Sequence, residues 1–501
     1  MPTLSPKPYT VTKDQFYKGE TIISIDASQF AGTAKKEGQL EISFQHCHFD
    51  KVKVICPDNI DFGEIGMHFY GCTVKAFEIG ELASRDISIN FGSCLLSARL
   101  ESSELQSVSL NNCIADSVYL LKIPRVNISY SEENIFPHEW HKLLGIAGID
   151  CKAAIAFSQR YHIEGVEKIY FEKRESEEKD KGLFVVPYRS IDHPNRMGYR
   201  LSDAEKLTLD ISLYIKIAND NPTGEVKITN VRLSALTLTG EGDGKIRIEN
   251  ARIDNIYLYD FSPTKEAGFF NIRPASEGND RRIGIHKCNL DNVWFDNFDF
   301  IRYNHLSFYK SKFAKTTYTS CSFPDSYKAF GKFQGIENVH YPDRKEENSD
   351  KDLYELLLQL KKALEGTGNY YEAQKIHSIS HEALKRVKQL PRQERIILGI
   401  NNLSNTHGLS IGRPFLGLIF FSVFFYALYL LSLGRIFNAT AVDWKLFGYY
   451  FSFLDLTHRT DFLVDKDEFT GASLAIDYVA KIFTGFFIYQ FIASFRKYGK
   501  K

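Results

Sequence analysis

Val226-Lys-Ile-Thr-Asn-Val-Arg-Leu-Ser-Ala-Leu-Thr-Leu238 and Ile246-Arg-Ile-Glu-Asn-Ala-Arg-Ile-Asp-Asn-Ile-Tyr-Leu258 carry one pattern, repeated after 20 residues. Apolar residues occupy positions 0, +2, +7, +10 and +12 of each copy, and Asn230 or Asn250 occupies position +4. Apolar residues two positions apart lie on one face of a β-strand, so each copy predicts short strands with one buried face. The asparagine marks the corner at which the chain turns.

The same spacing recurs on both sides of this stretch. Further copies begin at Ile42, Met67, Val108, Ile283 and Leu306, and a partial copy begins at Ile89. Stacked coils of roughly 20 to 25 residues, each covering the apolar face of its neighbour, predict a mainly β fold. We therefore expect an irregular right-handed β-solenoid, followed by an α-helical hairpin and two transmembrane helices.

The cysteines support this repeat, because they were not used to define it. Six of the eight occupy position +5 if a further copy starts at Thr316: Cys47, Cys72, Cys94, Cys113, Cys288 and Cys321. A stack of thiols could bind metal, but one cysteine per coil without a CxxC motif favours a small residue buried in the solenoid wall. We expect no disulfides, because the cysteines are dilute and the region is predicted to be cytosolic.

Changes in the pattern divide the chain. The predicted parts are an N-terminal β-solenoid (1–130), a helical or irregular insertion (131–206), a second β-solenoid part (207–342), a helical hairpin and linker (343–410) and a two-helix transmembrane domain with an outer loop (411–501). The larger insertion is a candidate docking surface for a partner. A smaller insertion is predicted at residues 265–282, where glycine and asparagine indicate a loop.

Two segments near the C-terminus are candidates for crossing a membrane. Residues 414–433 carry no charge and have roughly the 20 residues that a spanning helix needs. Residues 472–495 are nearly as apolar but contain Asp477 and Lys481, which are spaced i,i+4 and can pair on one helix face. A deep position would place this pair at a pore or a subunit contact, and a shallow one would place it at the membrane interface.

The distribution of charge predicts the orientation. Lysine and arginine gather before the first span and after the second, whereas the loop between the spans is acidic. The N-terminus lacks the basic and apolar regions of a secretory signal. We expect a two-pass inner-membrane protein with both termini in the cytoplasm. The 62 basic residues equal the 62 acidic residues, so we expect no nucleic-acid partner.

The sequence shows no motif of an enzyme. A P-loop, a G-x-S-x-G elbow and a Rossmann fingerprint are all missing from it. The histidines at 377 and 381 lack the glutamate of an HExxH site, and those at 138 and 141 have the wrong spacing for one. We interpret both pairs as exposed or packing residues. The sequence therefore predicts a protein that is not an enzyme, without a catalytic, cofactor or metal site.

Two resemblances add to this interpretation. The coils resemble pentapeptide-repeat and parallel β-helix proteins in plan, although the strict A-(D/N)-L-x-x register is not kept. The order of span, amphipathic segment (444–454), loop and span resembles a two-transmembrane potassium-channel subunit. In bacterial proteins of that layout, a soluble repeat domain and a helical hairpin like that at 368–373 often precede the pore.

The chain departs from that channel family at the selectivity filter. Where the T-x-G-[YF]-G motif should stand, the chain has Asp455-Leu-Thr-His-Arg-Thr-Asp461, without a glycine to present carbonyl groups to an ion. Potassium selectivity is therefore not implied. The candidate pore side chains are Asp455, His458 and Asp461, and the alternative is an ordinary polar outer loop.

The resemblance implies a function. A cytosolic solenoid would sense or dock a protein partner and would couple through the hairpin to a channel-like pore or membrane-perturbing effector in the lipid bilayer. Two spans cannot enclose a pore, so several identical subunits would be needed, four by analogy with channels. Phage defence is one context for such a design. The alternative is a membrane-anchored scaffold that conducts nothing.

Overall fold

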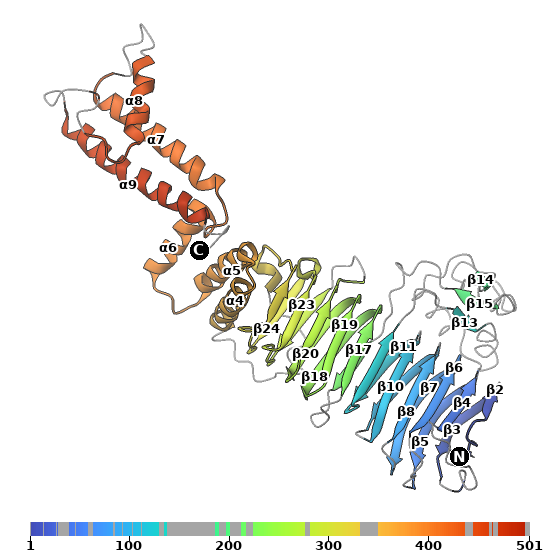
Figure 1. The fold of residues 1–501 in the computed structure, drawn as a ribbon. Coiled ribbons are helices and arrows are strands. Elements are labelled where there is room, and N and C mark those ends of the chain that lie inside the picture. Colours follow the sequence, from blue (N-terminus) through green and yellow to red (C-terminus); the bar gives the residue numbers. More distant parts are fainter. Residues whose placement is uncertain are drawn as a thin grey trace, which may run out of the picture. The chain divides into compact units, whose positions relative to one another are not determined.

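The structure is a computed structural model (Figure 1). It describes residues 2–13, 15–26, 28, 40–45, 47–58, 64–83, 86–92, 94–102, 104–111, 113–129, 135–137, 186–189, 197–200, 212–216, 224–275, 281–330, 349–435, 444–459, 463 and 469–495. The chain forms two compact units, Met1–Arg344 and Lys345–Lys501, and each is described by itself.

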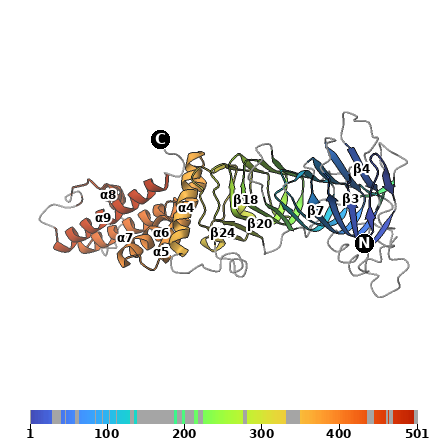
Figure 2. The same cartoon turned by 90° about the horizontal axis from the view of Figure 1, so that it is seen from below.

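The first unit is a parallel β-solenoid, as predicted. Its described strands form two sheets of 11 strands each, and successive strands alternate between the sheets. One sheet contains β1 (Thr3–Leu4), β3 (Phe16–Ser24), β5 (His48–Cys56), β7 (Thr73–Leu82), β9 (Leu95–Glu101), β11 (Ile114–Leu121), β16 (Ser212–Lys216), β18 (Arg232–Gly242), β20 (Arg252–Pro263), β22 (Arg282–His286) and β24 (His305–Tyr309). Figure 2 shows the coils following one another in chain order, from blue β3 and β4 to yellow β24.

The second sheet has the same construction. It contains β2 (Val11–Lys13), β4 (Leu40–Gln45), β6 (Ile65–Tyr70), β8 (Ile87–Gly92), β10 (Leu105–Asn111), β12 (Arg125–Ser129), β17 (Glu225–Thr229), β19 (Lys245–Glu249), β21 (Ala267–Phe270), β23 (Val293–Asp296) and β25 (Thr317–Thr319). Short 3-10 helices, η3 (Phe300–Arg302) and η4 (Tyr327–Phe330), accompany the last coils. Each coil thus contributes one strand to each sheet.

The position +4 of the repeat is a left-handed corner. Asn230 and Asn250 have φ angles of 57° and 52°, and Gly71 at the equivalent place has 61°. Asparagine and glycine adopt this region more readily than other residues. Adjacent corners also bond to each other, since Asn271 Nδ2 donates to Asn250 Oδ1 at 2.8 Å and Asn297 Nδ2 donates to Asn271 Oδ1 at 3.1 Å. The corner residue therefore joins the coils as well as turning the chain.

The last two copies of the repeat are displaced by half a coil. Ile283 lies on β22 and pairs with Ile256, which is position +10 of the copy before it. The displacement arises because residues 265–282, interpreted from sequence as an insertion, contain β21, a regular strand between β19 and β23. Both sheets use the same alternation of apolar residues before a corner, so the pattern alone does not distinguish them.

The two predicted solenoid parts share continuous sheets. β11 pairs with β16 and β12 pairs with β17, both in parallel, across the segment between them. Within that segment, β13 (Ile135–Pro137), β15 (Met197–Arg200) and β14 (Val186–Arg189) form a separate antiparallel sheet. The sequences at 139–146 and 153–157, interpreted as helical or irregular, lie outside the described residues.

The solenoid core contains a ladder of phenylalanine rings. Phe44, Phe69 and Phe91 come from successive coils, and their rings stack with centroids 5.1 Å apart at each step. Phe49 and Phe77 meet this ladder edge-on from the other sheet. All five side chains are buried. A coil that loses its ring loses contacts on both sides of the stack.

The second unit is helical. It contains α4 (Ser349–Gly366), α5 (Tyr370–Arg386), α6 (Arg392–Asn405), α7 (Gly412–Ser432), α8 (Trp444–Leu454) and α9 (Gly471–Ser494). α4 and α5 form the predicted hairpin, and the side chain of Asn369 caps α5 by accepting from the backbone N–H of Glu372. α7 packs along α9.

Two described helices, α7 and α9, are long and apolar enough to cross a membrane. α7 has 21 residues, which gives a length of about 31 Å against a hydrocarbon core of about 30 Å. Only 22% and 28% of their apolar windows are buried, so neither is the enclosed core helix of a soluble protein. The prediction of two candidate membrane helices is confirmed, and they indicate a membrane protein.

Candidate functional site

The candidate site lies where the loop after α8 meets α9. α8 is about 16 Å long, which is too short to cross a bilayer. Its Phe453 packs against Tyr426 and Tyr429 of α7, and the hydroxyls of Tyr450 and Ser422 lie 2.7 Å apart. α8 is therefore fixed along one face to α7 and delivers the following loop to the start of α9.

Three of the side chains predicted from sequence meet in this site. Asp477 is 1% exposed, and its Oδ1 lies 2.8 Å from His458 Nε2. Its Oδ2 lies 3.1 Å from Lys481 Nζ, so the predicted i,i+4 pair is present. Lys481 Nζ also donates to the backbone carbonyl of His458 at 3.2 Å. The loop histidine and the two helix residues, which the sequence placed in separate groups, form one network.

The other two predicted pore residues are not part of this network. Asp455 is exposed, and it accepts hydrogen bonds from the backbone N–H and the hydroxyl of Thr457, at 2.9 and 2.7 Å. These bonds lower the pKa of the Asp455 carboxyl. The Asp455 backbone carbonyl bonds to His458 Nδ1, which orients the ring. Asp461 lies outside the described residues.

Asp477 belongs to a buried polar stripe along α9. The buried residues of this helix are Ser473, Asp477, Ala480, Thr484, Phe487, Gln490 and Ser494. Its exposed side carries large apolar residues, among them Tyr478, Ile482 and Ile492. Soluble helices bury apolar residues and expose polar ones. α9 does the opposite, which is typical of a helix surrounded by lipid. The polar residues of this stripe are spaced by four, seven, six and four positions, which is close to whole turns of a helix, and this spacing in an apolar segment was the signal for the stripe. The sequence interpretation used only Asp477.

The stripe continues to the other end of α9, where the helix meets α6. Gln490 Nε2 donates to Asn401 Oδ1 at 3.1 Å, and the Gln490 Oε1 accepts from Asn405. Ser494 Oγ donates to the carbonyl of Ser410 at 2.9 Å. These contacts fix α9 to the C-terminal end of α6 and to the turn that follows it. The sequence interpretation could not identify them, because the partners lie 80 to 90 positions apart.

The predicted histidine pair of α5 lies near a third histidine that the sequence interpretation missed. The rings of His377 and His381 are 4.2 Å apart at their centroids, and His381 Nδ1 lies 3.0 Å from His407 Nδ1. Burial lowers the pKa of His381, and it lowers that of His407 to about 4. Within the described residues, no cluster of three or more histidine, cysteine, aspartate or glutamate side chains could hold a metal ion.

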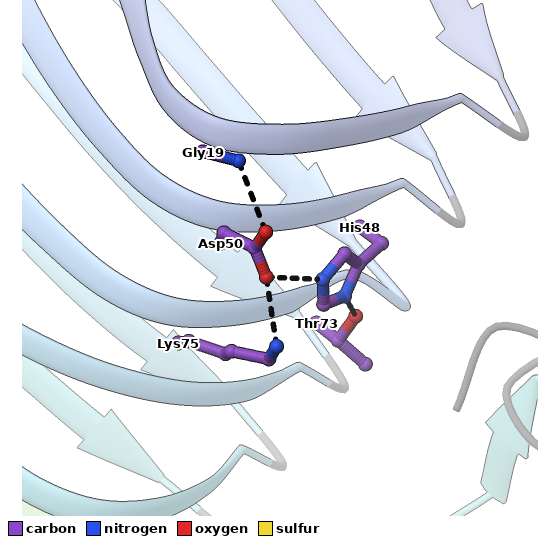
Figure 3. A network of polar contacts seen from close by, with 5 residues as sticks. All are labelled: Gly19, His48, Asp50, Thr73 and Lys75. Carbon is purple, nitrogen blue, oxygen red and sulfur yellow. Dashed lines mark hydrogen bonds and ion pairs between the residues drawn. The ribbon is translucent and has the colours of Figure 1, made fainter. Parts of the chain in front are cut away.

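A second polar network lies in the solenoid (Figure 3). His48 Nδ1 is 2.5 Å from Thr73 Oγ1, and His48 Nε2 is 3.2 Å from Asp50 Oδ1. Asp50 also accepts from Lys75 Nζ at 2.7 Å and from the Gly19 N–H at 3.0 Å, which hold the pKa of its carboxyl well below its usual range. The order hydroxyl, imidazole and carboxylate is that of a hydrolase triad. His48 and Thr73 are buried, however, so we interpret the network as a tie between three coils.

The cysteine ladder is part of the solenoid wall. The seven described cysteines are all buried. In the ladder, each Sγ lies near the carbonyl two residues earlier and near a carbonyl of the preceding coil, as for Cys94 with Gly92 and Phe69 at 3.3 Å each. Burial raises the pKa of the Cys288 thiol to about 12. A protonated buried thiol is a poor metal ligand, which favours the wall interpretation.

No family model matches this chain, and neither a curated protein nor a solved structure is significantly similar to it.

Proposed function

We propose that this protein couples a cytosolic β-solenoid, which senses or docks a protein partner, to an oligomeric, channel-like pore or membrane-perturbing effector. The observation that carries the proposal is the polar stripe of α9, with Asp477 paired to both the loop and the helix. A membrane tether needs only apolar surface. A buried charged network between a loop and a span is costly to place near lipid and typically serves function.

The surface of α8 supports an assembly of several subunits. Phe447 and Phe451 are 60% and 59% exposed, although the opposite face of the helix already packs on α7. A short helix that is apolar on both sides requires lipid or a neighbouring subunit around it. One subunit supplies only two spans, so a conducting path would be formed between copies, with four as the channel-like number.

In this proposal, Asp477 does not face water in the resting arrangement. Both of its carboxylate oxygens are engaged, one by His458 and one by Lys481. The network holds the loop against the outer part of α9. Opening would separate Asp477 from His458 and Lys481. A protein bound to the solenoid would supply the energy for this separation through α4 and α5. The inner membrane and an antiviral depolarising role belong to this proposal by analogy of design.

Two measurements on the full-length protein test the proposal. Native mass spectrometry in mild detergent is expected to show a closed homo-oligomer, and liposomes containing the protein are expected to pass ions. An Asp477→Asn variant removes the charge that holds the loop and is expected to increase the flux severalfold, whereas Glu394→Gln, at an exposed acid of α6, is the control and is expected to leave the flux unchanged. A strictly monomeric protein, with no flux from wild type or Asp477→Asn, would leave the membrane-anchored scaffold as the function.

A further inference from the structure

The helical unit contains a half-open polar cavity where the hairpin and α6 meet the C-terminal half of α9. Its volume is about 350 Å³, within the range of small-molecule sites. Residues of α4, α5, α6, α9 and the turn after α6 line it. Its polar lining includes Lys361, His377, His381 and His407. The cavity therefore touches the element that leads from the solenoid and the element that spans the membrane.

The donors in this cavity are arranged for a negatively charged ligand. The Nδ1 atoms of His381 and His407 lie 3.0 Å apart, so one ring donates and the other accepts. Burial lowers the pKa of both histidines, and the positive charges of Lys361 near His381 and of Lys385 near His407 lower it further. The imidazoles thus lie in positive surroundings. The wall also contains Glu365, whose carboxylate is 3.7 Å from Lys361 Nζ, a separation that leaves the ammonium able to turn to a stronger acceptor.

The turn that carries His407 is strained and held in place. Thr406, His407 and Gly408 all have positive φ angles, of 53°, 53° and 90°. Threonine is branched at Cβ and rarely adopts this region. Ser378 Oγ donates to the Thr406 carbonyl at 3.2 Å, and Gln374 Nε2 donates to the His407 carbonyl at 2.6 Å. Strain that is held in this way commonly accompanies a binding site or a switch, because it presents a side chain in a fixed place.

We propose that this cavity binds a phosphate group, carried either by a soluble phosphorylated molecule or by the headgroup of an anionic lipid. The Lys361 ammonium, the N–H of His377 and the one ring N–H that the His381–His407 pair leaves outside its own hydrogen bond would donate to the phosphate oxygens, as charged and neutral donors do in phosphate sites. Binding itself is independent of ion conduction. Only the use of the site to control α7 and α9 rests on the proposed function.

The binding test uses full-length protein in nanodiscs of phosphatidylcholine and radiolabelled inorganic phosphate at constant ionic strength. Wild type is expected to bind phosphate saturably. Lys361→Gln and His381→Gln are each expected to weaken binding about tenfold, the effect of one charge-assisted hydrogen bond. Lys362→Gln, on the exposed side of the same helix, is the matched control and is expected to bind like wild type.

A second arm separates the two sources of phosphate. Nanodiscs in which phosphatidylglycerol replaces part of the phosphatidylcholine are expected to lower phosphate binding if a lipid headgroup occupies the cavity, and to leave it unchanged if the ligand is soluble. Both results support a phosphate site. No saturable binding in phosphatidylcholine discs would overturn it, as would an equal loss in Lys361→Gln and Lys362→Gln. Circular dichroism of each variant identifies unfolded protein, and His381→Asn then replaces a variant that fails to fold.

Discussion

The solenoid and α9 bury opposite kinds of residue. The solenoid encloses phenylalanine, isoleucine, valine and cysteine, and it places asparagine at its corners. α9 encloses Ser473, Asp477, Thr484 and Gln490 and exposes Ile482 and other apolar side chains. The same chain thus follows two rules of burial. The difference follows from the solvent that each part is built for, since water drives apolar groups inward and lipid favours polar groups inside.

The two parts should consequently differ in how far the destabilising effect of a single substitution extends through the structure. Each coil of a solenoid contacts only its neighbours, so its stability is a sum of similar local terms. The helical unit depends on a few polar contacts between distant residues, such as Asp477 with His458 and Gln490 with Asn401. A single change there removes a contact that no neighbouring repeat replaces.

The largest effect is expected from Phe69→Ala in the phenylalanine ladder. Loss of this buried ring should cost about 3–5 kcal/mol, because it leaves a cavity between two stacked rings. Tyr70→Ala, at a neighbouring exposed position, should stay within about 0.5 kcal/mol. Thiol labelling during urea unfolding measures both, with Cys94 as the nearby reporter and Cys288 as the distant one. If Cys94 and Cys288 of Phe69→Ala were labelled equally early, the coils would unfold as one unit. That result would contradict the expectation that each coil depends only on its neighbours.

Asp477→Ala is the corresponding test of the helical unit. It leaves His458 and Lys481 without their buried acceptor and should cost about 3 kcal/mol. Asp455→Ala, in the same loop but exposed, should cost under about 1 kcal/mol. Hydrogen exchange in detergent measures the two variants at the peptides of α8 and α9. If Asp477→Ala were no more mobile there than Asp455→Ala, the network would not hold the loop.

Acid should weaken the helical unit through its buried histidines. The pKa of His407 is lowered from 6.5 to about 4, so the folded protein holds this ring neutral while the unfolded chain protonates it. The contribution is fully present above pH 6.5 and is lost as the pH falls from 6.5 towards 4, by at most about 3 kcal/mol. His407→Asn should flatten this dependence, measured by hydrogen exchange of α5 and the turn after α6. An unchanged pH profile in that variant would contradict the assignment.

The smallest effect is expected at a solenoid corner. Asn271→Ala should cost about 1–2 kcal/mol, because alanine is strained at a φ of 56° and the ladder bonds to Asn250 and Asn297 are lost. Asn271→Gly relieves the strain but not the lost bonds, and it should cost about half as much. Urea unfolding followed at Cys288 measures both. If both variants lost the same free energy of unfolding, the hydrogen bonds between asparagine side chains, and not the backbone conformation, would determine the stability of the corner.

The sequence by itself determined the repeat, the two candidate spans and the pairing of Asp477 with Lys481. These features are local: apolar spacing, segment length and an i,i+4 relation are all written within 25 residues of chain. The sequence interpretation misplaced residues 265–282, because one alternation of apolar residues serves both sheets and does not say which sheet a strand joins.

Only the tertiary structure decided which side chains from different elements contact each other. It brought His458 to Asp477, His407 to His381, and Gln490 to Asn401 and Asn405, and it showed that the polar residues of α9 share one buried face. The physical reason is that these contacts join separate helices through turns, and a turn such as 406–408 owes its conformation to side chains of another helix. Spacing along a sequence records the periodicity of an element, whereas the direction in which two elements face each other is set by their packing.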